Sequence, residues 1–342
     1  MALLNQSCII HYGMRGDISR FILKDDVIYD TVWQKGSGIK KNGVIARGVD
    51  DMKACSDGQG SLFLFCTAVS GDIEVFTMKD GNVFHSVIKT GGADVLIRDI
   101  RPYFSADVCE LLISHSKRDN RNERVLTKYT LDPEELKAGI RYPDHCSKDL
   151  MEYGTFGPAD EMAAVKYEEE NSTVVSVIEK GEDANSIILL KENRFGYVEG
   201  LIKISMDREI FWHDIHISGW EADVVYTVKE GGGFSIKHMV YDIKNHRLSE
   251  EKDIRTNTAC SHPLIVKYRG EKRVCWYEKG AVYSRKKDSA GGFENAVKRK
   301  ESAGRDLHCA HFILDDKQLK NQTGSEFRKV FLIYPDNIMT GF

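Results

Sequence analysis

The sequence predicts an all-β protein, a seven-bladed β-propeller, and three observations support this prediction. Many short runs alternate between apolar and polar residues, as strands with one buried face do. Turn-forming residues separate these runs. In Ile73–Ile88 two alternating runs flank Asp80 and Gly81, a pair that readily adopts the positive φ values of a tight hairpin. The third observation is that this unit recurs seven times, with turn centres at Asp25, Asp80, Asp132, Lys180, Glu230, Lys279 and Pro335.

The spacing of these turns favours a propeller over a sandwich. Successive turn centres lie 55, 52, 48, 50, 49 and 56 residues apart. A period near 50 residues fits one blade of four short strands. A β-sandwich instead shows turn signals every ~8–12 residues without a longer period. Because each blade needs its neighbours to bury both sheet faces, we expect residues 1–342 to form a single domain.

The first three blades are expected in the N-terminal part of the chain. A short helix is predicted at Pro133–Ala138, since proline suits a first helical turn, and the polar run Lys117–Glu123 predicts a loop. The expected strands are Cys8–Gly13, Ser19–Asp25, Val27–Trp33 and Gly43–Gly48 for blade one, Ser61–Ala68, Asp72–Lys79, Asn82–Lys89 and Val95–Phe104 for blade two, and Asp107–Ser114 and Arg124–Leu131 for blade three.

The remaining blades are expected at the same spacing. The expected strands are Glu161–Tyr167, Ser172–Glu179, Ser186–Lys191 and Tyr197–Ser205 for blade four, Glu209–Ile217, Ala222–Lys229, Phe234–Tyr241 and Leu248–Ile254 for blade five, Pro263–Tyr268, Lys272–Tyr277, Ala281–Arg285 and Ala296–Lys300 for blade six, and Leu307–Leu314, Phe327–Tyr334 and Asn337–Phe342 for blade seven. Blade seven thus lacks a fourth strand, and Met1–Asn5 is left over. We expect the N-terminal strand, Ala2–Asn5, to pair with the last blade and close the ring without an exposed edge.

Composition excludes several classes of partner. The 342 residues carry a formal net charge of −4, so the chain as a whole is not attracted to nucleic acid or anionic lipid. No apolar run approaches the ~18 residues of a membrane span, and the N-terminus lacks the pattern of a signal peptide. The eight cysteines show no paired spacing, so we expect free core thiols and synthesis in a reducing cytoplasm, whether or not the protein later leaves in a particle.

One segment of blade six resembles the Asp-box of sialidase-type propellers. In Ser284–Phe293 the aspartate and the aromatic residue of that motif are matched by Asp288 and Phe293. Ala290 and Gly292 depart from its central glycine and threonine. In that family the motif braces an outer hairpin away from the catalytic residues, so the resemblance implies a propeller fold and no activity.

Catalytic residues are not predicted. Sialidases use an arginine triad, a Tyr–Glu nucleophile pair and an aspartate, and these residue types occur here as Arg98, Arg101, Arg141, Tyr277 and Glu278. Tyr277 and Glu278 are adjacent on a strand, however, so their side chains should point to opposite faces and could not act together. A glycoside hydrolase that uses acidic residues from several blades is kept as an alternative.

The sequence also predicts no metal or cofactor. His213 and His216, like His308 and His311, are three residues apart and should face opposite sides of a strand. Gly231–Gly233 suits a hairpin turn, because no helix follows it to receive a phosphate. Histidines of innermost strands could still converge on a metal; the candidates are His11, His115, His216 and His311.

Trp220 is the candidate ligand-binding residue. It follows Ile217-Ser-Gly in a short turn of blade five, where an indole ring could stack on a sugar or anchor a protein. The alternative is that Trp220 covers the neighbouring blade. Trp33, Trp212 and Trp276 lie within expected strands and should belong to the core.

These observations favour a non-catalytic recognition or docking module. In overall character the chain looks like a receptor-binding or tail-fibre component of a bacteriophage or phage-tail-like particle. Its expected partners are a cell-surface glycan, a protein receptor, or other subunits of a larger assembly. The alternatives are the hydrolase considered above and a cytosolic scaffold for protein partners.

Overall fold

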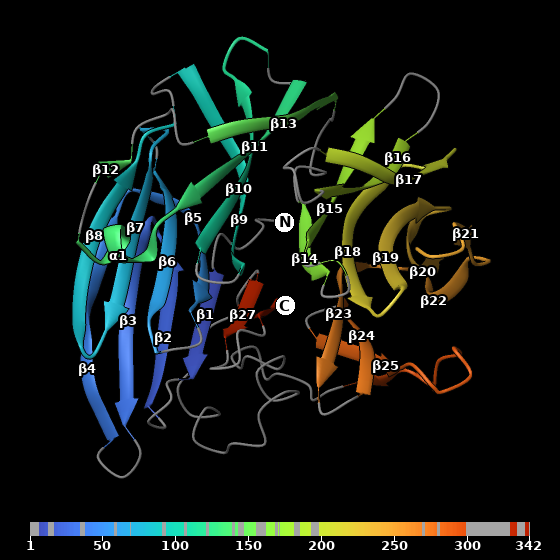
Figure 1. Ribbon diagram of the computed structural model, residues 1–342. Coiled ribbons are helices and arrows are strands. Elements are labelled where there is room, and N and C mark those ends of the chain that lie inside the picture. Colours follow the sequence, from blue (N-terminus) through green and yellow to red (C-terminus); the bar gives the residue numbers. More distant parts are fainter. Residues whose placement is uncertain are drawn as a thin grey trace. The chain divides into compact units, whose positions relative to one another are not determined.

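The computed structural model describes residues 7–298 with breaks, together with 329–333 and 339–341 (Figure 1). The breaks are 13–16, 35–37, 58–59, 69, 91–93, 106–107, 121–122, 139–140, 143–146, 155–161, 168–169, 171, 181–184, 193–197, 269–270 and 279–280. The described residues form an all-β protein with six sheets and one short α-helix. The chain divides into two units, the first containing Met1–Arg121, Val125–Asp149 and Gly324–Gly341, and the second mainly Leu150–Thr323.

The first sheet of unit 1 joins the two ends of the chain. Its order is β28-β27-β1-β2-β3-β4, and β1 pairs with β27 in parallel, Ile9 opposite Phe331. The predicted Asp25 turn is confirmed, since Asp25 and Asp26 have φ values of 49° and 59° between β2 and β3. The strands are β1 (Ser7–Tyr12), β2 (Asp17–Lys24), β3 (Val27–Gln34), β4 (Gly38–Arg47), β27 (Lys329–Ile333) and β28 (Met339–Gly341).

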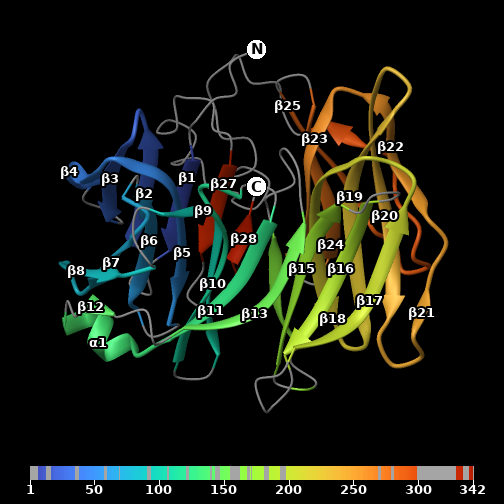
Figure 2. The same ribbon diagram turned by 90° about the horizontal axis from the view of Figure 1, so that it is seen from above.

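The second sheet runs in the order β12-β8-β7-β6-β5. Its predicted Asp80–Gly81 turn joins β7 to β8, and the predicted helix α1 (Pro133–Ala138) lies beside β8, as Figure 2 shows. The Ser86 hydroxyl donates to the Leu136 carbonyl at 2.9 Å, which attaches the helix to the sheet. The strands are β5 (Val49–Ser56), β6 (Leu62–Ala68), β7 (Ile73–Lys79), β8 (Asn82–Ile88) and β12 (Arg141–Tyr142).

The assignment of Val95–Phe104 to blade two was wrong. That segment is β9, which pairs with β10 in the third sheet, and the unpredicted strand β5 completes the second sheet. The sequence pattern did not indicate β5, because Lys53 is charged and therefore reads as a solvent-exposed residue. In the structure this lysine is fully buried beside the carboxylates of Asp51 and Asp99. The third sheet has the order β13-β11-β10-β9, with β9 (Val95–Ser105), β10 (Val108–Lys117), β11 (Glu123–Leu131) and β13 (Ser147–Gly154).

Apolar side chains of neighbouring sheets fill the interior of unit 1. One cluster joins the first and second sheets and includes Ile9, Phe21 and Leu64. Another joins the second and third sheets and includes Phe63 and Leu111. The cysteines whose side chains the structure describes are free, as predicted, and buried: Cys55, Cys66, Cys109, Cys260 and Cys275.

Unit 2 contains three sheets whose expected positions are confirmed. Their orders are β14-β15-β16-β17, β18-β19-β20-β21 with β22 also on β20, and β23-β24-β25-β26. The strands are β14 (Ala163–Tyr167), β15 (Ser172–Lys180), β16 (Asn185–Glu192), β17 (Val198–Met206), β18 (Ile210–Ser218), β19 (Glu221–Glu230), β20 (Gly233–Asp242), β21 (Arg247–Leu248), β22 (Lys252–Thr258), β23 (Cys260–Tyr268), β24 (Glu271–Glu278), β25 (Ala281–Lys286) and β26 (Val297–Lys298).

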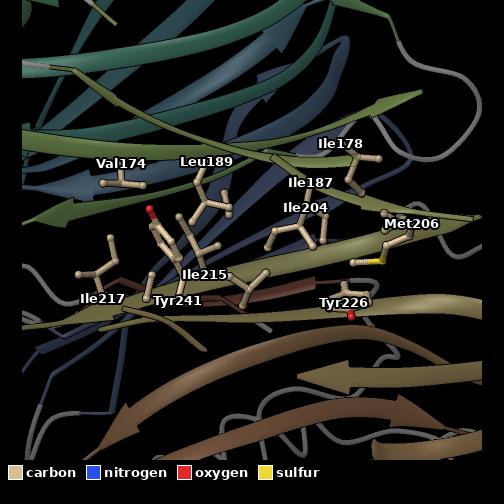
Figure 3. Close-up of a cluster of buried hydrophobic side chains, with 14 of the residues drawn as sticks. Val174, Ile178, Ile187, Leu189, Ile204, Met206, Ile215, Ile217, Tyr226 and Tyr241 are labelled. Carbon is tan, nitrogen blue, oxygen red and sulfur yellow. The ribbon is translucent and has the colours of Figure 1, made fainter. Parts of the chain in front are cut away.

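The sheet centred on β19 is buried on both faces. On one face Ile215, Val224 and Tyr241 pack against Val174 and Leu189 of the preceding sheet (Figure 3). On the other face lies a second cluster, formed with the following sheet by Val225, Ile236, Ile254, Cys260, Ile265, Val274 and Trp276. This double burial explains why β19 reads as a nearly continuous apolar run.

The expected count of seven blades is not confirmed. The described residues form six sheets, and two of the three strands expected in blade seven, β27 and β28, extend the first sheet. The ends of the chain do pair, but through β1 and β27; Ala2–Asn5 and the expected strand Leu307–Leu314 lie outside the described residues. Within those residues, α1 is too short to cross a membrane, and no other helix could do so.

Candidate functional site

Trp220 lies at the tip of a short hairpin in unit 2, where it was predicted. Ser218 pairs with Glu221, so Gly219 and Trp220 form the turn between β18 and β19. Gly219 has a φ of 59°, which favours glycine. The Trp220 carbonyl accepts a hydrogen bond from the Ile243 amide at 2.8 Å, and 40% of the Trp220 surface is exposed. The turn is therefore fixed by its backbone while the indole faces solvent.

The neighbouring turn between β20 and β21 carries polar groups in a defined arrangement. The backbone N–H and the side-chain Nδ2 of Asn245 both donate to the Asp242 carboxylate, at 3.0 and 2.7 Å respectively. His246, with a φ of 52°, contacts the Tyr241 hydroxyl at 3.0 Å through Nδ1. That hydroxyl also donates to the Leu201 carbonyl at 2.9 Å. We call Trp220 together with Asp242 and Asn245 the Trp220 site.

The chemistry of the Trp220 site suits a ligand that carries hydroxyl groups. The hydrogen bonds from Asn245 lower the pKa of Asp242, so this exposed carboxylate is ionised at neutral pH and can accept hydrogen bonds from hydroxyl groups. The adjacent indole offers an apolar face. An aromatic surface beside a few fixed polar groups is a common arrangement for recognising a small ligand.

A second polar cluster surrounds Asp223, three residues along the chain from Trp220. Asp223 is 1% exposed, and its Oδ1 accepts hydrogen bonds from His238 Nε2 at 2.8 Å and Lys287 Nζ at 2.5 Å. Its Oδ2 accepts one from Lys272 Nζ at 2.7 Å. Burial alone would raise the pKa of Asp223, but these three donors outweigh burial and hold the pKa well below its ordinary value.

A third cluster lies near the opposite end of β19. Arg208 donates to Glu230 and Glu251, both at 2.6 Å, and the Tyr226 hydroxyl also donates to Glu251. Burial, followed by the contact with Glu251, raises the pKa of Tyr226 well above its ordinary value. Burial opposes ionisation of Glu230, but donors that include Arg208 and Lys237 lower its pKa to about 2. These shifts move both groups away from the near-neutral pKa values that acid–base catalysis needs.

The residue types noted for sialidase chemistry have other partners. Glu278 is 2% exposed and accepts two hydrogen bonds from Arg255, at 2.9 and 2.8 Å, and one from Trp276 Nε1 at 3.1 Å. In unit 1, Arg101 pairs with Asp99 at 3.4 Å, and Arg98 donates to Ser116 at 3.4 Å. Tyr277 and Arg141 are described only as parts of β24 and β12. The contacts of Glu278 are those of a structural ion pair.

Asp288, the aspartate matched to the Asp-box, accepts hydrogen bonds within its own loop. Its Oδ1 accepts hydrogen bonds from the amides of Ala290 and Gly292, at 2.9 and 2.7 Å. Lys287 and Phe293 form an isolated bridge that ends the loop. Phe293 also packs edge-on against His238 at 5.0 Å. Asp288 thus braces an outer hairpin. The residue that ends its loop, Phe293, contacts His238 of the Asp223 cluster.

The histidines considered as metal ligands have other contacts. His213 Nε2 contacts the Ser176 hydroxyl at 2.7 Å in a buried position. His216 lies on β18 opposite Asp223. His308 and His311 lie outside the described residues, and His11 is described only as part of β1. Over the ranges that the structure describes, no three His, Cys, Asp or Glu side chains are placed to hold a metal ion.

His115 forms a relay in unit 1. The Thr127 hydroxyl donates to Asp149 Oδ1 at 2.6 Å, so His115 Nε2, 2.9 Å from that hydroxyl, must be the donor to it. His115 Nδ1 is then unprotonated, and it is buried without a hydrogen-bond partner in the described part of the chain. Burial lowers the pKa of His115 more than the Asp149 charge raises it. The fold therefore favours the neutral ring.

This preference predicts a pH dependence of stability. The unfolded chain binds a proton at His115 near pH 6.5, whereas the folded protein binds it at a lower pH. The contribution of the neutral ring should be complete above about pH 6.5 and fall as the pH drops below that value. Urea unfolding at pH 7.5 and pH 5.5 should show a smaller difference for His115→Gln than for the wild type; equal differences would contradict this assignment.

Comparison with known proteins identifies the fold. No family model and no curated protein matches the sequence. A variant of Aleuria aurantia lectin in complex with alpha-methyl-L-fucoside is similar, with a TM-score of 0.51 and 9% identity, covering 87% of this chain and 96% of that chain. A structure described as a fungal lectin with a six-bladed β-propeller fold and a novel fucose recognition mode has a TM-score of 0.50, 11% identity and the same coverage.

At this level of identity the likeness concerns the fold alone, and the chain has a β-propeller fold. The similar structures support neither the sialidase type nor a tail-fibre protein. Within the Trp220 site, sequence reasoning found Trp220 but missed Asp242 and Asn245. It also missed the Asp223 cluster, whose three hydrogen-bond donors lie 15, 49 and 64 residues from Asp223. No local sequence motif indicates contacts between residues that lie so far apart in the chain.

Proposed function

We propose that residues 1–342 form one non-catalytic β-propeller domain that binds carbohydrate, with Trp220 as the residue on which a sugar ring stacks. The observation that carries this proposal is the exposed indole at a hairpin tip whose backbone is fixed by the Ile243 amide. A pre-positioned aromatic ring loses little conformational entropy when it binds a ligand.

The neighbouring side chains support a sugar ligand over an apolar one. A sugar ring presents C–H groups to an aromatic face and hydroxyl groups at its edge. Asp242 accepts hydrogen bonds and Asn245 both donates and accepts them, which matches a ring of hydroxyls. The similar lectins bind fucose according to their descriptions, so a propeller of this kind can serve as a scaffold for sugar binding.

Glycan-array binding followed by calorimetry tests this function with a matched pair of variants. Trp220→Ala should weaken binding to the best glycan by about tenfold or more, because truncating a central aromatic residue at an interface typically costs more than 1 kcal/mol. Tyr29→Ala is the control, since Tyr29 is also 40% exposed but lies in unit 1. Equal effects of the two variants, or no glycan binding by the wild type, would refute the proposal.

A screen of chromogenic glycosides separates binding from hydrolysis. The proposal expects no turnover, in line with the pKa shifts of Tyr226 and Glu230. Turnover that is abolished by substituting one carboxylate would favour the glycoside hydrolase considered from the sequence. No observation on the described residues favours a tail-fibre protein or a cytosolic scaffold, and we do not propose either role.

A further inference from the structure

Two lysines and a histidine converge on one carboxylate near the Trp220 site. Lys272 is the second residue of β24, and Lys287 directly follows β25. The Lys287 amide donates to the Lys272 carbonyl at 2.9 Å. Both ammonium groups contact Asp223, each through a different carboxylate oxygen. The two positive charges are therefore held close together by the fold.

The charges of this cluster do not cancel. In the contacts between described residues two ammonium groups face one carboxylate, so these contacts leave one positive charge unpaired even when His238 is neutral. The next acid along the loop, Asp288, uses Oδ1 to accept hydrogen bonds from backbone amides. Asp214 on β18 accepts a hydrogen bond from the Ile265 amide at 2.9 Å. Among the described contacts, Asp223 is the acid that both lysines share.

Both ammonium groups have donors left for a ligand. Each ammonium carries three N–H donors, and Asp223 takes one hydrogen bond from each lysine. The side chains of Lys272 and Lys287 are 18% and 13% exposed, whereas that of Asp223 is 1% exposed. Both lysine side chains are thus partly exposed, while the carboxylate that positions them stays buried.

Asp223 and the Trp220 site belong to the same end of one sheet, and the two lysines come from the following sheet. Asp223 follows Trp220 by three residues at the start of β19, a distance of ~10 Å along an extended strand. We propose that Lys272 and Lys287, positioned by Asp223, form a subsite for the acidic group of an anionic glycan, a carboxylate or a sulfate. This inference rests on the proposed function and specifies the ligand class of that site.

A glycan array holding neutral, uronic-acid and sulfated oligosaccharides tests the subsite. We expect the wild type to prefer the acidic glycans, by tenfold or more in calorimetry against a neutral oligosaccharide of equal length. Added salt should weaken the preference, since exposed charges are screened. Uronic-acid and sulfated glycans are scored separately, and a preference for either class supports the subsite.

Single variants assign the preference to this cluster. Lys272→Gln and Lys287→Gln should each remove most of the preference for acidic glycans while leaving neutral binding intact. Each variant keeps one lysine and His238 on Asp223, and thermal unfolding verifies that it is folded. Lys203→Gln is the charge-matched control, because the exposed side chain of Lys203 pairs with Glu179 in the preceding sheet. The control should keep the preference.

The outcomes separate the two proposals. A wild type that binds only neutral glycans through Trp220 overturns the acidic subsite and leaves the proposed function standing. A preference for acidic glycans that Lys272→Gln and Lys287→Gln do not reduce also overturns the subsite. Absence of binding to every glycan overturns both.

Discussion

Replacing Asp223 with Asn is expected to destabilise the protein by about 3 kcal/mol, near the lower end of the effect of breaking a buried ion pair. The reason is that Lys272, Lys287 and His238 all direct a donor at this carboxylate. An amide accepts through one oxygen and carries no charge, so two ammonium groups would face each other without compensation. The partial exposure of the lysines keeps the effect from being larger.

Denaturant unfolding measures this effect, with Asp242→Asn as its control. Asp242 is on the same sheet but exposed, so its substitution should change stability far less. The pH dependence provides a second test. Because the folded protein lowers the pKa of Asp223, its stabilising contribution should be complete above about pH 4 and be lost as the pH falls further. Equal stability of the two variants at pH 7 would contradict the assignment.

Truncating Trp276 to Ala should destabilise the protein by about 3–5 kcal/mol. Trp276 is 2% exposed, stacks on Tyr283 at 5.8 Å and belongs to the cluster that joins the last two sheets of unit 2. Its removal leaves a cavity. It also takes away the Nε1–H donor to Glu278, which is itself buried.

The same substitution at Trp220 serves as the matched control for Trp276→Ala. Trp220 is 40% exposed at a turn, so Trp220→Ala should change the unfolding free energy by only about 0.5 kcal/mol. The two substitutions are thus expected to give opposite results: Trp276→Ala should lower stability, and Trp220→Ala should weaken the proposed glycan binding. Similar destabilisation by both variants would show that the Trp220 ring belongs to the core and would remove it as a ligand contact.

Sequence patterns located most strands but assigned some of them to the wrong sheet. In unit 2 the predicted strands agree with the structure because turns such as Gly231 and Gly232 mark their ends. In unit 1 the strand β5 was missed, because its charged residues Lys53 and Asp51 read as solvent-exposed, although Lys53 is fully buried. Alternation reports that a segment is a strand; it does not report which strands it pairs with.

The same limit applies to the candidate site. Trp220 could be found because a large aromatic residue in a short turn is visible in the sequence itself. Asp242 and Asn245 are linked to Trp220 only by a contact that the sequence does not show, the hydrogen bond from the Ile243 amide to the Trp220 carbonyl. The Asp223 cluster depends on packing between two sheets, and its partners come from β20, β24 and the residue after β25.

The pairing of β1 with β27 has a consequence for synthesis. The first sheet contains two strands that the ribosome makes long after β1, since β27 and β28 begin at Lys329 and Met339. A nascent chain that lacks them exposes one edge of β1, and such an edge can pair with other chains. A chain truncated before Lys329 should therefore be prone to aggregate.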